Sequence, residues 1–205
     1  IGACRLCLVE IEKVRGLQPA CSTPVRPEMV VHTDTPAIRT MRATTLEFLL
    51  TNHPLDCPVC DKGGECHLQD QVFVHGPDRS RFIEGKRHKA KAHVLGEQII
   101  MDQERCVLCR RCIRFMEEWA DDVQLGVIER GARSYVDTFP GASLDSVFSG
   151  NVVHLCPVGA LTSRQFRFSA RSWELSHADS ICARCGMGCN TSLHSKANRL
   201  KRVVP

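Results

Sequence analysis

Thirteen cysteines, gathered at short spacings in a chain of 205 residues, limit what this protein can fold into more than any other feature. An odd number of cysteines cannot all pair as disulfides, and no secretion signal is visible where the chain opens with Ile1-Gly2-Ala3-Cys4. Repeated C-x2-C pairs in a chain without signs of export are typical of metal ligands. We therefore expect small modules whose folding depends on bound metal.

The most specific pattern is the triplet Cys106-x2-Cys109-x2-Cys112. Bacterial ferredoxins carry C-x2-C-x2-C-x3-C-P around their 4Fe–4S clusters. Here Met116 stands where the fourth cysteine is expected, and the only later cysteine followed by proline is Cys156. We expect residues 113–155 to fold out and to return Cys156 to the same cluster.

Four arginines surround this triplet, namely Arg105, Arg110, Arg111 and Arg114. Positive charge near a cluster would raise its reduction potential, because it stabilises the added electron. The alternative is that these side chains are simply solvated.

A complete set of four donors comes earlier, in His53-x3-Cys57-x2-Cys60-x5-Cys66. A neutral imidazole and three thiolates suit a metal centre. The pair Gly63-Gly64 would let the backbone approach a bulky cofactor. His53 could instead be a helix-end residue favoured by the helix dipole, but the three well-placed cysteines favour a ligand.

Two further sets have three cysteines each. The first is Cys4-x2-Cys7-x13-Cys21, which has the C-x2-C pair of a plant-type 2Fe–2S site without its upstream cysteine. By itself this set suits iron or zinc. The last is Cys182-x2-Cys185-x3-Cys189, without a fourth ligand. We expect the chain to be an internal fragment whose missing ligands lie beyond its ends.

Together the four sets use every cysteine of the chain. A Cys–His nucleophilic enzyme would need a spare thiol, and no G-x-G-x-x-G or other phosphate-binding loop is present. The formal charge of +4 does not require nucleic acid as a partner, because four loaded clusters would add about −7. No apolar run is long enough for a membrane span.

The expected secondary structure is sparse. Leu6–Glu12 alternates like a strand, and residues 97–102 could form another. Thr44-Thr45-Leu46-Glu47 predicts a capping box that starts a helix through Leu50, and residues 54–94 should be rich in loops. Further short helices are expected over Ile113–Ala120 and from Pro157 to Leu161.

The order of these sets resembles the N-terminal part of the large iron–sulfur subunit of respiratory NADH:quinone oxidoreductase, complex I. The matching strings cover nearly the whole chain: HPLDCPVCDKGGEC at 53–66, SRFIE at 80–84, DSVFSG at 145–150, CPVGALT at 156–162 and WEL at 173–175. Related NAD-linked hydrogenases and formate dehydrogenases usually carry two ferredoxin clusters, whereas this chain has one such motif. The fourth set resembles the additional 4Fe–4S site of some bacterial versions.

The resemblance implies an α+β chain built as a string of small cluster modules. Residues 1–42 would be the remnant of a plant-type 2Fe–2S ferredoxin domain, 43–95 a His/Cys3 4Fe–4S module and 96–175 a ferredoxin-like 4Fe–4S module. Residues 176–205 would start a molybdopterin-oxidoreductase-like 4Fe–4S domain. The cofactors would be one 2Fe–2S cluster and three 4Fe–4S clusters, the last incomplete in this chain.

The implied function is that of an electron-transfer subunit of NADH dehydrogenase. Electrons would come from NADH through FMN on a partner subunit and leave toward quinone, so that this chain has cluster ligands and no catalytic residues of its own. The partners would be the other peripheral-arm subunits, with no nucleic acid and with membrane contact only through those partners, on the cytoplasmic side of a bacterial inner membrane. The alternatives are the electron-entry arm of an NAD-linked hydrogenase or formate dehydrogenase, and a zinc-bound structural or nucleic-acid-binding module.

Overall fold

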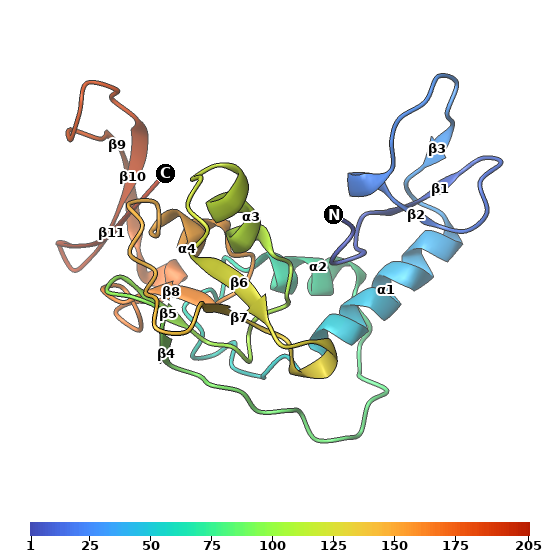
Figure 1. The fold of residues 1–205 in the computed structure, drawn as a ribbon, viewed down its shortest axis with the longest axis horizontal. Helices are drawn as coiled ribbons and strands as arrows, with labels where there is room; N and C mark the ends of the chain where they lie inside the picture. Colours follow the sequence, from blue (N-terminus) through green and yellow to red (C-terminus); the bar gives the residue numbers. More distant parts are fainter.

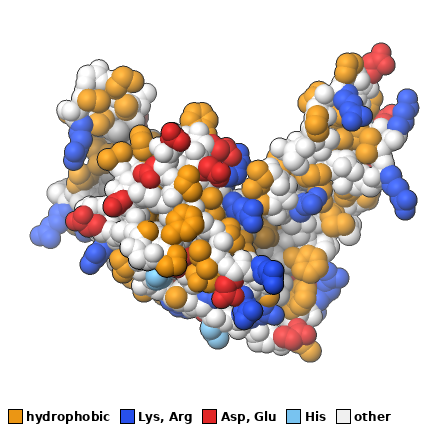
Figure 2. All heavy atoms as spheres, viewed as in Figure 1, with side chains coloured by type: hydrophobic (Ala, Val, Ile, Leu, Met, Phe, Trp, Pro, Cys, Tyr) orange, Lys and Arg blue, Asp and Glu red, His pale blue; other side chains and the backbone are white.

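The computed structural model describes residues 1–205 and consists of a central body with an arm at each end (Figure 1). The N-terminal arm holds a sheet in the order β2-β1-β3, and the C-terminal arm a sheet in the order β11-β10-β9. The central body holds the sheet β4-β5-β8, the ribbon β6-β7 and the short helices α2, α3 and α4. Figure 2 shows the two arms standing apart, with a hollow between them.

The N-terminal arm is small. Strand β1 (Leu8–Ile11) pairs antiparallel with β2 (Gln18–Pro19) and with β3 (Val31–His32). A 3₁₀ turn over Ala20–Ser22 follows β2. The strand expected within Leu6–Glu12 is confirmed, and its apolar residues Leu8, Val9 and Ile11 are buried.

Helix α1 (Pro36–Leu50) runs from this arm into the central body (Figure 1). Thr35 caps it by accepting a hydrogen bond from the Ile38 amide, and Pro36 occupies the first turn, where its missing N–H costs nothing. The predicted start at Thr44 is therefore wrong. Thr44 lies inside the helix, where its hydroxyl donates to the Thr40 carbonyl at 3.0 Å.

Residues 54–94 are rich in loops, as expected, but they also contain a helix that the sequence did not predict. Cys66 begins helix α2 (His67–His75), which buries Leu68 in the core. Residues 76–92, which follow α2, form no helix or strand and are tied to α1: the guanidinium of Arg81 pairs with the buried Glu47, and Lys86 donates to the carbonyl of Leu50 at 2.7 Å. These contacts fasten a segment that has little core of its own.

The central sheet joins distant parts of the chain. Strand β5 (Ile99–Met101), within the expected strand 97–102, pairs with β4 (His93–Val94) and with β8 (Leu161–Ser163). The helix expected over Pro157–Leu161 is wrong, because Leu161 pairs with Met101 as a strand. The helix that does form there is α4 (Asn151–Leu155), which ends at Cys156.

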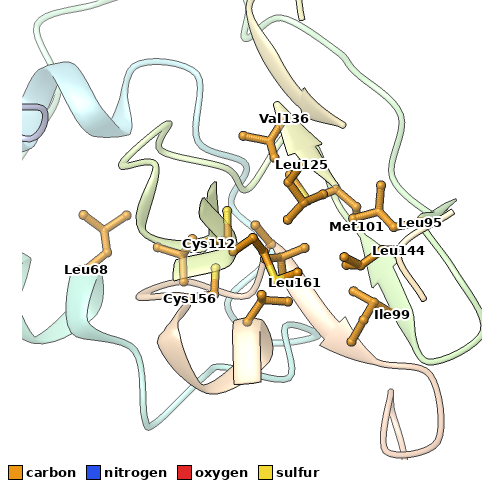
Figure 3. Close-up of a cluster of buried hydrophobic side chains, with 14 of the residues drawn as sticks. Leu68, Leu95, Ile99, Met101, Cys112, Leu125, Val136, Leu144, Cys156 and Leu161 are labelled. Atoms are coloured by element: carbon orange, nitrogen blue, oxygen red, sulfur yellow. The ribbon is translucent and has the colours of Figure 1, made fainter. Parts of the chain in front are cut away.

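Helix α3 (Arg111–Glu118) starts two residues before the predicted Ile113. The ribbon of β6 (Leu125–Ile128) and β7 (Tyr135–Thr138) follows it, with a 3₁₀ turn over Gly131–Arg133. These elements enclose the main core, which contains both aliphatic side chains and thiols (Figure 3). Its members are Leu46, Cys66, Leu68, Leu95, Ile99, Met101, Cys112, Met116, Leu125, Val136, Leu144, Val152, Cys156, Val158, Ala160 and Leu161.

The C-terminal arm is a three-stranded meander. After a 3₁₀ turn over Ser172–Glu174 come β9 (Ser176–Ile181), β10 (Asn190–Lys196) and β11 (Arg199–Val204). Most of its side chains are exposed or half-buried, and His194 is its one buried residue. No helix of the structure has the length and apolar character to span a bilayer.

Candidate metal centres

The triplet Cys106, Cys109 and Cys112 meets Cys156 in the central core. Cys106 and Cys109 lie on the loop before α3, Cys112 lies in its first turn, and Cys156 lies at the C-terminal end of α4, which packs on α3. All four line one small cavity of about 20 Å³. Figure 3 shows Cys112 and Cys156 directed into the same part of the core.

The loop of this triplet is tightly curled. Leu108 and Arg110 both have a left-handed backbone, with φ of 51° and 60°. The Leu108 amide donates to the Cys106 sulfur at 3.4 Å. Left-handed residues are costly for side chains with a Cβ, so the surrounding core holds the loop in a shape that turns its thiols inward.

Burial dominates the electrostatics of these thiols. It raises the pKa of Cys106 and of Cys112 to about 12, and the neighbouring thiols contribute to both shifts. Four thiolates could therefore coexist here only with positive charge placed among them. A cluster of iron ions bound by four thiolates supplies that charge, so the donor set fits such a group.

The set His53, Cys57, Cys60 and Cys66 lies on the turn between α1 and α2. Cys60 and Cys66 are buried and Cys57 is exposed. Burial raises the pKa of Cys66, and the charges of Cys60 and Cys57 raise it further, so the three thiols are electrostatic neighbours. Arg105 is a charged neighbour common to His53 and Cys60.

His53 has the properties of a ligand. Burial lowers its pKa to about 4, with the charges of Arg105 and Lys86 adding to the effect. The ring is therefore neutral at pH 7. Its Nδ1 is buried without a hydrogen-bond partner, which is a rare and costly state for a polar atom. A metal bound to this nitrogen would satisfy it.

Two glycines leave room beside these thiols. A Cβ at Gly159 would overlap the sulfur of Cys60, and a Cβ at Gly63 would lie 2.8 Å from the Cys57 carbonyl oxygen. The thiol of Cys66 donates to the carbonyl of Pro157 at 3.7 Å. The turn 156–160 therefore provides a thiol to the Cys106 set and backbone contacts to the His53 set. The local sequence contains no sign of this link between the two sets.

The two outer sets lie on exposed loops. In the N-terminal arm, the Cys21 sulfur accepts from the Gly2 amide at 3.3 Å, and this bond together with a hydrogen bond from Cys7 lowers the pKa of Cys21 to about 7. Cys4 lies three residues before Cys7, half-buried. The structure thus brings Cys7 and Cys21 together.

In the C-terminal arm, residues 182–189 form the loop between β9 and β10. The Cys182 amide donates to the Cys189 carbonyl at 2.8 Å, which closes the base of the loop. Cys185 lies between them and is exposed, as is Cys189.

No three His, Cys, Asp or Glu side chains converge on a point where one metal ion could bind them all. The ligands of a cluster attach to different iron atoms, so its thiols need not converge in that way.

Three family models match the chain in sequence order. Residues 1–36 match a 2Fe-2S iron-sulfur cluster binding domain, 42–81 the NADH-ubiquinone oxidoreductase-G iron-sulfur binding region, and 96–162 the ferredoxin-like domain of NADH-quinone oxidoreductase subunit 3. These matches support a mixed α/β chain built from iron–sulfur modules.

Curated relatives match the chain from end to end. It is 47% identical to the second G-type subunit of NADH-quinone oxidoreductase from Rhizobium meliloti over 99% of this chain. It is 46% identical to the G-type subunit from Rickettsia prowazekii over 100% of this chain. It is 45% identical to the mitochondrial NADH-ubiquinone oxidoreductase 78 kDa subunit of Neurospora crassa. The chain spans 24%, 30% and 28% of these relatives, respectively.

A solved structure is also similar. The crystal structure of an NAD+-reducing [NiFe]-hydrogenase in the H2-reduced state aligns with a TM-score of 0.73 at 28% identity. The alignment covers 83% of this chain and 73% of the hydrogenase chain. Similarity to the NADH-quinone oxidoreductases is higher and runs from end to end. The chain is therefore homologous, over its whole length, to the iron–sulfur binding segment of G-type subunits of NADH-quinone oxidoreductases.

Proposed function

We propose that this chain is the electron-relay segment of a respiratory NADH dehydrogenase, which carries electrons from NADH, by way of a flavin on a partner subunit, toward quinone. One observation carries the proposal. Two four-donor sets share one core and one turn, since Cys156 belongs to one set while Pro157 and Gly159 touch Cys66 and Cys60 of the other. Redox centres that share one turn and one hydrophobic core suit electron transfer between them.

The proposed ligands fall into four groups. Cys4, Cys7 and Cys21 would hold a 2Fe–2S cluster. The 4Fe–4S clusters would be held by His53, Cys57, Cys60 and Cys66, by Cys106, Cys109, Cys112 and Cys156, and by Cys182, Cys185 and Cys189 with a further ligand. Bound clusters supply one-electron transfer, and this chain supplies ligands, burial and nearby charge, which tune each potential.

The proposed surroundings follow from the relatives. Those are subunits of NADH-quinone oxidoreductase complexes, so the partners would be other peripheral subunits, including one that binds flavin and NADH. In a bacterium the chain would lie on the cytoplasmic side of the inner membrane, and it would reach that membrane only through partners. Residues 1–42, 43–95, 96–175 and 176–205 are the proposed modules.

Iron analysis of the full-length protein, followed by exchange of the one imidazole ligand, tests the proposal. We expect a brown protein with about fourteen iron atoms per chain and a similar amount of acid-labile sulfide. His53→Cys replaces a neutral ligand with an anionic thiolate, so the midpoint potential of that centre, measured by EPR-monitored titration, should fall. His75→Cys, at the end of α2, is the control and should leave it unchanged.

Two results would contradict the proposal. A colourless, zinc-loaded protein would favour a structural module, and an unmoved midpoint in His53→Cys would exclude His53 as a ligand.

The second candidate function is the electron-entry arm of an NAD-linked hydrogenase, which the similarity to the NAD+-reducing [NiFe]-hydrogenase favours. The native complex distinguishes the two. Reduction of its clusters by NADH, coupled to quinone reduction, supports the relay of a respiratory dehydrogenase, whereas reduction by H2 supports the hydrogenase arm.

A further inference from the structure

A buried arginine links the two inner donor sets. Arg105 precedes Cys106 in the chain, but its guanidinium points to a different part of the molecule. It donates from Nη2 to Asp56 Oδ2 at 2.9 Å, and its Nε lies 3.2 Å from Asp102 Oδ2. Its side chain is only 4% exposed. Asp56 directly precedes Cys57, so the charge of Arg105 is placed beside the His53 set.

The charges around Arg105 are shared within one network. Lys91 Nζ lies 2.7 Å from Asp56 Oδ2 and 2.7 Å from Glu104 Oε2. His88 adds a hydrogen bond to Glu104 at 2.9 Å. Arg105 is the most buried cation of the network, since Lys91 is 45% and His88 86% exposed. Water screens exposed charges strongly and buried ones weakly, so Arg105 has the largest influence on its surroundings.

The geometry places this charge next to the His53 set and outside its proposed ligands. Asp56, whose Oδ2 lies 2.9 Å from Nη2 of Arg105, stands between His53 and Cys57 in the chain. The second ion pair, with Asp102, holds the guanidinium in this position.

We infer that Arg105 is a positioning residue that raises the reduction potential of the centre held by His53, Cys57, Cys60 and Cys66. The inference rests on the proposed function, since it requires a cluster at this site. Reduction adds one electron, and hence one negative charge, to the centre. A fixed, buried guanidinium stabilises that added charge, whereas the carboxylate of Asp56 opposes it.

The inference reverses one expectation from the sequence. Arg105 stands next to the Cys106 triplet in the chain, so its position alone predicts that its charge acts there. The ion pair with Asp56, 49 positions away, directs it to the other centre instead. Arg114 differs, because it is 42% exposed and pairs with Glu118 on its own helix at 2.9 Å.

EPR-monitored redox titration of the native complex with substituted subunits tests this role. Arg105→Gln should lower the midpoint of the His53 centre, so that the ratio of reduced to oxidised centre at a fixed potential falls about tenfold, which corresponds to about 59 mV for one electron. Arg105→Lys keeps the charge and should restore most of the shift. Asp56→Asn removes a negative charge and should move the midpoint upward, opposite to Arg105→Gln.

Arg114→Gln is the matched control and should leave this midpoint unchanged. Equal midpoints in wild type, Arg105→Gln and Asp56→Asn would overturn the inference, as would shifts of the same sign in both variants, which a purely structural role would give. If Arg105→Gln loses the cluster, the midpoint of Asp56→Asn tests the inference alone: an upward shift supports it and a downward shift overturns it. Absence of the EPR signal from the unsubstituted protein would instead overturn the proposed function.

Discussion

The inner and outer donor sets differ in what surrounds their thiols. Cys60, Cys66, Cys112 and Cys156 are buried, and three of them belong to the main hydrophobic core. Cys21, Cys185 and Cys189 are exposed, on loops of two small sheets. The inner sets are thus part of what holds the central body together, whereas the outer sets are local attachments to the arms.

The same difference appears in the acidity of the thiols. Burial raises the pKa of Cys112 to about 12, while hydrogen bonds from Gly2 and Cys7 lower that of Cys21 to about 7. An exposed thiolate can form without help from a metal, but four buried or half-buried thiols around one point cannot all ionise without it. Loading of the inner sites with metal should therefore be coupled to folding, and loading of the outer sites should not.

The largest effect should come from removing one ligand on each side of this comparison. Cys156→Ser should lose about four iron atoms per chain and loosen the core, because it leaves the buried thiol of Cys112 and the half-buried thiols of Cys106 and Cys109 without their compensating charge. Cys185→Ser should also lose its cluster but leave the central body intact. Iron analysis, together with amide hydrogen exchange of α3, α4 and β8, measures both effects.

Equal rates of amide hydrogen exchange in α3, α4 and β8 of the two variants would show that the inner sites stabilise the central body no more than the outer sites do. Intact iron content in Cys156→Ser would show that Cys156 is not a ligand.

A smaller effect is expected from core packing without any change of ligand. Met101 is 1% exposed in the central core and Leu200 is 59% exposed on β11. Met101→Ala should cost about 2–5 kcal/mol of stability, whereas Leu200→Ala should change it by less than about 0.5 kcal/mol. Denaturant unfolding, followed by loss of the cluster absorbance, checks both values in the full-length protein.

If Leu200→Ala were as destabilising as Met101→Ala, the C-terminal arm would be part of the core rather than an attachment to it.

The grouping of the thiols could be predicted from the sequence because short spacings place cysteines on one loop. The return of Cys156 to the triplet was also readable, since only one later cysteine precedes a proline, and the structure brings its thiol into the same cavity. The orientation of the Arg105 side chain could not be predicted in this way. Its partner Asp56 lies in another segment, and the local sequence contains no sign of that contact.

The predicted start of helix α1 is wrong for a different reason. Thr35-Pro36 is itself a helix-start signal, with a capping side chain before a proline in the first turn. It competes with Thr44–Glu47, which fits a capping box equally well. The structure resolves the competition through tertiary contacts, since Ile38 and Leu46 are both fully buried and need one continuous helix.

The contact that joins the C-terminal arm to the inner region is made by Arg202 of β11 and Glu65, next to Cys66. The guanidinium donates to both carboxylate oxygens at 2.8 and 2.7 Å, and it lies over the ring of Phe166 at 4.7 Å. Burial tends to raise the pKa of Glu65, but the hydrogen bonds and charge of Arg202 outweigh it and hold this pKa below its usual value. The pair therefore stabilises docking of the arm at neutral pH.

The smallest expected effect is loss of this pair in Glu65→Gln. For a half-buried charged pair we expect about 1 kcal/mol, so amides of β10 and β11 should exchange about fivefold faster than in the unsubstituted protein. Glu129→Gln, which breaks the exposed pair with Arg133 at 3.1 Å, is the control and should leave their exchange unchanged. A folded-state pKa that is lowered gives stability above the unfolded-state pKa, which is lost as the pH falls through the lowered value. The difference between Glu65→Gln and the unsubstituted protein should therefore shrink in acid below the ordinary glutamate range. Equal exchange of the two proteins at neutral pH would assign the docking to Phe166 and the neighbouring apolar contacts instead.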